Sequence, residues 1–161
     1  MLFRSRVRAA YKTRTQSWTS AELRAAVPQP LANRKEWKLT ASHNAAGCKA
    51  AVDDNPSSRY DTQTSQVPGM WIQIELPQAT KISGIELDAA NSTADYPRGY
   101  KVELSTDGKT WSAPVATGAG NTPLTDISFP PAMARVIRIT QTGAVSGLFW
   151  SIHELNVFAA K

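Results

Sequence analysis

The stretch Gly69-Met70-Trp71-Ile72-Gln73-Ile74-Glu75-Leu76 decides the fold class of this chain. From Ile72 onward an aliphatic side chain falls on every second residue, with polar side chains between. A period of two is typical of a β-strand that buries one face and exposes the other. The stretch therefore predicts a strand over an apolar core.

The same alternation recurs at residues 85–87, 101–105, 136–140 and 154–158. Asp107-Gly108 predicts a hairpin turn, because glycine accepts the positive φ that such turns need. No helical pattern and no internal repeat lies between these runs. Short alternating strands joined by turns rich in Gly, Pro, Asn and Asp predict an all-β fold, an antiparallel β-sandwich of jelly-roll type.

Residues 1–36 differ from the rest and are predicted to be a basic linker or the tail of an upstream module, with the sandwich at residues 37–161. They hold eight Lys or Arg and two acids, a net charge of +6, whereas residues 37–161 carry a net charge of −1. A short helix is expected at residues 17–26, stopped by Val27-Pro28-Gln29-Pro30. The overall charge of +5 thus belongs to the arm.

Composition argues against a nucleic-acid partner, a disulfide, a membrane span and a signal peptide. No basic run interleaved with aromatics marks the sandwich, so no nucleic-acid partner is expected. Cys48 is the only cysteine, which rules out an intrachain disulfide, and it is expected to be a small buried residue. No apolar stretch approaches the roughly 20 residues of a membrane span, and the first residues lack the apolar core of a signal peptide.

Two oxygen-rich segments, residues 50–60 and 149–157, suggest a cation site. Asp53, Asn55 and Ser58 offer carboxylate, carbonyl and hydroxyl oxygens, and Glu154 can close such a site from the last strand. Calcium takes about 6–8 oxygens of these kinds. The alternative is an ordinary Asx turn punctuated by Asn55-Pro56.

A family resemblance rests on six motifs in order: the loop from Ala50 to Tyr60, the opening stretch at 69–76, and residues 82–87, 97–108, 135–140 and 150–155. Over residues 37–161 the chain resembles a discoidin, or coagulation factor 5/8 type C, domain. It is most similar to the bacterial branch classed as family 32 carbohydrate-binding modules, which share a galactose-binding-like sandwich.

The resemblance implies a structural calcium ion and where it is held. Carried onto this chain, its ligands are the Ala50 carbonyl, Asp53, Asn55, Ser58 and Glu154, with the His153 carbonyl as a further possibility. Asp54 stands where the family usually has glycine. If that position needs positive φ, aspartate tolerates it less well than glycine. Ser58 replaces the commoner threonine and keeps the hydroxyl.

Three loops, residues 61–68, 89–98 and 142–150, are candidates for a ligand surface. Tyr96 or Phe149 could stack on a sugar ring, and Arg98 and Asn91 could hydrogen-bond its hydroxyls. Arg98 pairing with Asp95, and Tyr96 capping the sandwich, are the structural alternatives. Trp150 is expected to belong to the core.

The function predicted from these features is non-catalytic carbohydrate binding, as a module of a larger extracytoplasmic protein, a setting implied by the resemblance. Its partners would be glycan and upstream domains of the same polypeptide. The alternative is a protein-interaction or structural module without glycan binding. Membrane binding through Val67, Leu148 and Phe149 is less favoured because no lysine cluster flanks them. No enzyme is expected, since no catalytic constellation is present.

Overall fold

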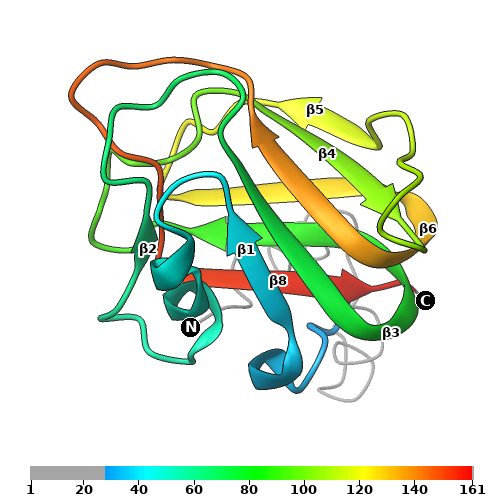
Figure 1. Ribbon diagram of the computed structural model, residues 1–161. Helices are drawn as coiled ribbons and strands as arrows, with labels where there is room; N and C mark the ends of the chain where they lie inside the picture. Colours follow the sequence, from blue (N-terminus) through cyan, green and yellow to red (C-terminus); the bar gives the residue numbers. More distant parts are fainter. Residues whose placement is uncertain (1–27, 161) are drawn as a thin grey trace, which may run out of the picture.

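The computed structural model describes residues 28–160, which form eight strands and two short 3-10 helices (Figure 1). The elements in chain order are η1 (Arg34–Glu36), β1 (Lys38–Ala41), η2 (Ala45–Val52), β2 (Tyr60–Asp61), β3 (Trp71–Asp88), β4 (Tyr100–Ser105), β5 (Ala116–Gly118), β6 (Leu124–Gln141), β7 (Ser151–Ile152) and β8 (Glu154–Ala159).

Two 18-residue strands, β3 and β6, run through both layers of the sandwich. Near Trp71 β3 pairs with β1 and with the end of β6, whereas near Leu87 it pairs with β8 and with the start of β6. The register shifts between Glu75 and Thr80, where both strands curl over from one layer to the other (Figure 1). β4 and β5 extend the first layer beyond β6. All pairings are antiparallel, which confirms the predicted all-β sandwich.

The core lies between the layers. In the first half of β3 buried and half-buried residues alternate, as the opening stretch predicted, with Ile72 and Ile74 fully buried. The predicted core positions of Trp150 and Cys48 are confirmed, because Trp150 is fully buried and Cys48 is one of the buried residues of η2.

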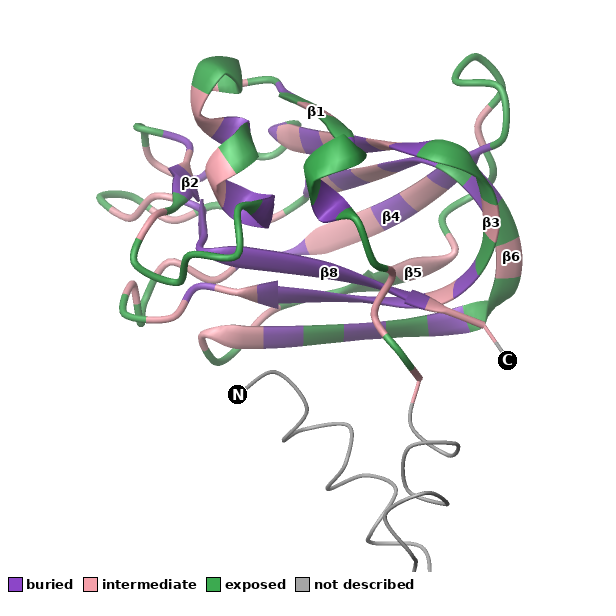
Figure 2. Cartoon of the chain, turned by 90° about the horizontal axis from the view of Figure 1, so that it is seen from below, coloured by how far each residue is buried: buried purple, intermediate pink, exposed green. Residues whose placement is uncertain are grey.

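Strand β8 departs from its predicted half-buried pattern, and that prediction is wrong: every residue from Glu154 to Phe158 is buried (Figure 2). The reason is a second cover on its outer side. Residues 29–31 run along β8, where the Leu31 amide donates to the Val157 carbonyl at 2.8 Å and the Ala159 amide donates to the Gln29 carbonyl at 3.2 Å. η2 also packs against β8.

The N-terminal predictions are addressed only in part. The expected helix at residues 17–26 lies outside the described residues, and the boundary at residue 36 stays a prediction. Arg34, counted with the basic arm, is nevertheless buried against the sandwich. Ala50 was expected in a loop but lies in η2, whose alanine-rich sequence favours helix and whose Val52 anchors it in the core.

The predicted turn at Asp107-Gly108 is confirmed within a longer connection between the antiparallel strands β4 and β5. Gly108 has φ of 76°, and the Asp107 carboxylate accepts from the amides of Lys109 and Thr110, both at 2.8 Å. Hydrogen bonds from these two amides lower the pKa of Asp107 to about 2.

Candidate functional site

The three predicted ligand loops meet at one end of the sandwich, beside β2 (Figure 1). The Thr62 amide donates to the Trp150 carbonyl at 3.1 Å, which joins the first loop to the third. Ser151 joins the second loop through its hydroxyl, which donates to Asp95 at 2.6 Å. The three loops therefore lie together, and their role as a ligand surface stays a prediction.

A buried glutamine, Gln66, fastens all three loops. Its side-chain amide donates to the carbonyls of Tyr96 (3.1 Å) and Phe149 (2.8 Å). Its side-chain oxygen accepts from the Arg98 amide at 3.1 Å and from the amide group of Gln141. Three of these four hydrogen bonds hold the backbone on which the candidate ligand residues sit, and the fourth joins Gln66 to the buried Gln141 side chain.

The second and third loops also approach so closely that only glycine fits. A Cβ on Gly143 would lie 2.6 Å from the backbone carbon of Arg98, and a Cβ on Gly99 would lie 2.8 Å from the Gly143 amide nitrogen. Neither contact could be relieved by turning a side chain, because backbone atoms are involved. The two glycines therefore set the spacing of the loops.

Arg98 and Tyr96 form a stacked pair. The Arg98 guanidinium lies 3.9 Å from the centre of the Tyr96 ring, and it donates to the Ala94 carbonyl at 2.7 Å. Asp95, the alternative partner considered for Arg98, accepts from Ser151. Tyr96 and Arg98 are both half-buried, and the guanidinium covers one face of the Tyr96 ring, so the pair holds an aromatic ring and a planar array of donors at one place on the loops.

The other two candidate ligand residues are less closely placed. Phe149 is half-buried, and Gln66 ties its backbone to that of Tyr96. Asn91 is exposed in a turn of the same loop as Tyr96. The structure brings Tyr96, Arg98 and Phe149 to one region, and it places Asn91 in the turn at residues 89–92.

The ligand loops are connected to the cation loop by His153, Ser92 and Arg59, none of which was singled out from the sequence as a candidate ligand residue. Buried His153 faces the Pro56 carbonyl through Nδ1 (2.9 Å) and the Ser92 hydroxyl through Nε2 (3.0 Å). Because a carbonyl only accepts, Nδ1 carries the proton. Arg59 donates to the same hydroxyl at 2.6 Å. Partners this distant in sequence leave no local signal, although Arg59 is part of the conspicuous 50–60 segment.

The predicted cation loop is held by its own hydrogen bonds. One Asp53 carboxylate oxygen accepts from the Asn55 amide at 3.0 Å, and the other accepts from the Ser58 hydroxyl at 2.6 Å. Three of the five predicted ligands, Asp53, Asn55 and Ser58, are therefore together. This geometry is that of the Asx turn considered as the alternative.

Glu154 lies in a different environment. One oxygen accepts from Arg34 at 2.6 Å, whereas Oε1 is buried and has no hydrogen-bond partner among the described residues. Burial raises the pKa of Glu154, the contact with Arg34 lowers it, and the charges of Asp54 and Asp53 raise it. The net result is a pKa above the ordinary value, as expected for a carboxylate that has too little positive charge nearby.

The donor set fits a hard cation in its chemistry. A buried carboxylate oxygen without a partner is a position that a metal would satisfy, and carboxylate, hydroxyl and carbonyl oxygens suit calcium. Asp53, Asn55, Ser58 and Glu154 with the Ala50 carbonyl would hold such an ion. Within residues 28–160 no group of three or more His, Cys, Asp or Glu side chains forms a metal cluster by itself.

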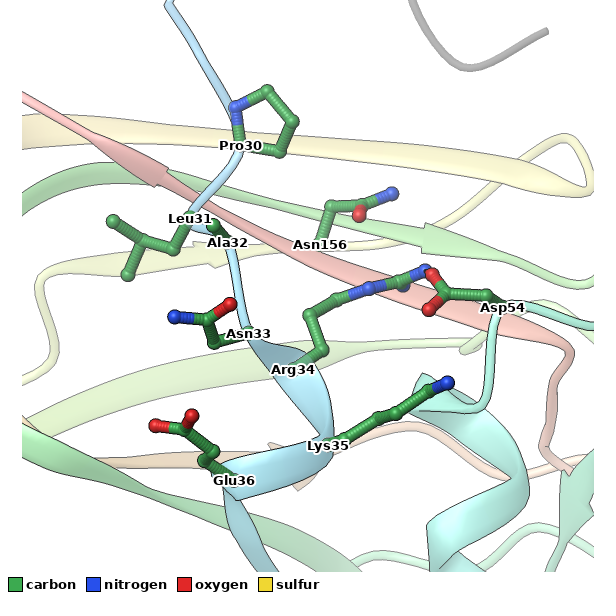
Figure 3. A pocket seen from close by; sticks show the side chains of 9 residues that line it. All are labelled: Pro30, Leu31, Ala32, Asn33, Arg34, Lys35, Glu36, Asp54 and Asn156. Carbon is green, nitrogen blue, oxygen red and sulfur yellow. The ribbon is translucent and has the colours of Figure 1, made fainter.

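A pocket of about 650 Å³ lies on the outer side of β8, apart from the three loops. It is lined by residues 30–36, Asp54 and Asn156. Figure 3 shows the Arg34 side chain extending along this pocket to Asp54. The pocket therefore marks where the N-terminal segment meets the sandwich.

Comparison with known proteins identifies the class. The family model described as "F5/8 type C domain" matches residues 35–155. The chain belongs to this family, as its motifs predicted. Galactose oxidase of Gibberella zeae is 28% identical over 152 residues, which cover 86% of this chain and 22% of the oxidase. A sialidase of Micromonospora viridifaciens is 32% identical over 66% of this chain and 18% of its own. The chain thus spans about a fifth of the length of these relatives.

Among solved structures, its neighbours are family 32 carbohydrate-binding modules. The module of NanJ from C. perfringens, in complex with galactose, is 26% identical with a TM-score of 0.64, over 78% of this chain and 95% of that module. The AlyQ module, in complex with 4,5-unsaturated mannuronic acid, is 27% identical with a TM-score of 0.62, over 76% and 95%. Within residues 28–160, no helix has the length and apolar character needed to cross a membrane.

Proposed function

We propose that this chain is a non-catalytic carbohydrate-binding module of a larger extracytoplasmic protein, and that it binds glycan through the loops around Tyr96 and Arg98. The observation that carries the proposal is the stacked Tyr96–Arg98 pair, presented on loops that Gln66 holds together. An aromatic ring together with a guanidinium suits a sugar, which offers one apolar face and a rim of hydroxyls. Related modules solved with galactose and with an unsaturated uronic acid support it.

The calcium ion belongs to the same proposal as a structural element. Held by Asp53, Asn55, Ser58, Glu154 and the Ala50 carbonyl, it would supply positive charge to a buried carboxylate. His153, which bridges the Pro56 carbonyl and Ser92, links that loop to the ligand loops. The ion would therefore stabilise the loop end without touching the glycan.

The test is a glycan-array screen, followed by calorimetric titration with galactose, uronic oligosaccharides and any array hit. Arg98→Ala is expected to weaken binding about 5- to 150-fold, the loss of one buried polar contact worth about 1–3 kcal/mol. Arg135→Ala is the matched control, because Arg135 is exposed on β6 and pairs with Glu75. Absence of binding to any glycan would contradict the proposal and favour a protein-interaction or structural module.

A further inference from the structure

Arg34 is a charged residue that is buried where the sequence predicted a solvated arm. Only 9% of its side chain is exposed, and the Glu154 side chain it contacts is 5% exposed. Nη1 donates to Glu154 at 2.6 Å and to the Leu155 carbonyl at 2.9 Å, while Nη2 contacts Asp54. The guanidinium thus joins the N-terminal segment, the cation loop and the last strand.

The conformation of Asp54 gives this contact added weight. Asp54 has φ of 61°, in the left-handed region that suits glycine best. Aspartate adopts this region less readily than glycine but more readily than most residues. The ion pair with Arg34 offsets part of the cost, and it directs the Asp54 side chain toward β8 (Figure 3).

The local charges are not balanced by Arg34 alone. Asp53, Asp54 and Glu154 carry three negative charges, and the guanidinium carries one positive charge. Arg34 satisfies one oxygen of Glu154 and leaves Oε1 without a partner. The carboxylate therefore has one oxygen bound to an arginine and another oxygen that is buried without a partner.

We propose that Arg34 is a built-in cation that positions Glu154 and keeps the loop end of the sandwich folded when calcium is absent. Calcium and Arg34 act on the same carboxylate from different oxygens, so each reduces the need for the other. The calcium part of this inference rests on the calcium site proposed above. The Arg34 part rests on the buried ion pair alone.

The test is thermal unfolding of the full chain in calcium chloride and in EDTA, for wild type, Arg34→Gln, Arg34→Lys and Lys35→Gln. Lys35 is an exposed neighbour, so its variant carries the same charge change outside the ion pair. In EDTA, Arg34→Gln is expected to melt about 10 °C below wild type, because it leaves a buried carboxylate uncompensated. Lys35→Gln is expected to match wild type.

Two results would support the electrostatic role rather than simple packing: a larger gain from calcium in Arg34→Gln than in wild type, or partial recovery in Arg34→Lys. If calcium shifts no variant while Arg34→Lys recovers, the calcium site fails and Arg34 stands as the cation of this site. The inference is overturned if Arg34→Gln melts within about 2 °C of Lys35→Gln in EDTA. It is also overturned if Arg34→Gln is destabilised equally in both conditions and lysine restores nothing.

Discussion

Replacing Gln66 by methionine is expected to destabilise the sandwich and loosen its ligand loops. Methionine has nearly the same length and is tolerated in tight cores, so the change removes hydrogen bonds with little change in volume. Four hydrogen bonds are lost, from Gln66 to the carbonyls of Tyr96 and Phe149 and to Gln66 from the Arg98 amide and the Gln141 side chain.

The size of the effect follows from how many of these groups can reach water. Each buried polar group left without a partner costs about 1–3 kcal/mol. Tyr96 and Phe149 are half-buried, so water can replace part of what their carbonyls lose, whereas Gln141 is fully buried. We expect a total of about 2–4 kcal/mol, or a decrease in melting temperature of roughly 6–20 °C for a domain of this size.

The assay is urea unfolding combined with amide hydrogen exchange. Gln78→Met is the matched control, since Gln78 is exposed beside Pro77. Exchange should rise at the amides of Arg98 and Val145, in the second and third loops, while the amides of β3 stay protected. If Gln66→Met unfolds within about 0.5 kcal/mol of Gln78→Met, the role of Gln66 in fastening the loops is refuted.

Three further predictions concern single sites. Gly143→Ala should destabilise the domain by about 1–3 kcal/mol in urea unfolding, because its Cβ meets the Arg98 backbone; an unchanged midpoint would contradict the close approach. Asp107→Asn should lower stability near neutral pH but not near pH 2. The lowered pKa of Asp107 confers stability above its unfolded value of 3.8 that is lost as pH falls to about 2, so a constant difference across a pH series of unfolding curves would count against it. Asp53→Ala should abolish any calcium-dependent rise in melting temperature. A retained rise would show that calcium binds at a different site.

The fold was predictable from local periodicity, but its long-range features were not. Alternation identified the halves of β3 as separate runs near Ile74 and Ile85. It could not show that they form one bent strand serving both layers, because pairing partners decide that. For Glu154 and Asn156 the alternation indicated exposure, and a segment more than 100 residues earlier covers them instead.

The candidate site shows the same division. Loop chemistry indicated that Tyr96 and Phe149, on different loops, would lie in one region, since polar loops of a sandwich gather at its ends, and Gln66 joins their backbones; their role in binding stays a prediction. No local sequence pattern could identify Gln66 as a structural residue, because its hydrogen-bond partners lie 30 to 83 residues away. Arg34 was assigned to a solvated arm by its neighbours, and only the position of Glu154 in the fold explains its burial.

The hydrogen bond between Gln29 and Ala159 has a mechanical consequence. The chain enters and leaves the sandwich at one edge, at the end of the six-residue strand β8 farthest from the ligand loops. Six extended residues span roughly 20 Å, so the tether point and the loops face opposite ways. In a longer polypeptide, attachment at this edge would leave the ligand loops directed away from the neighbouring domains.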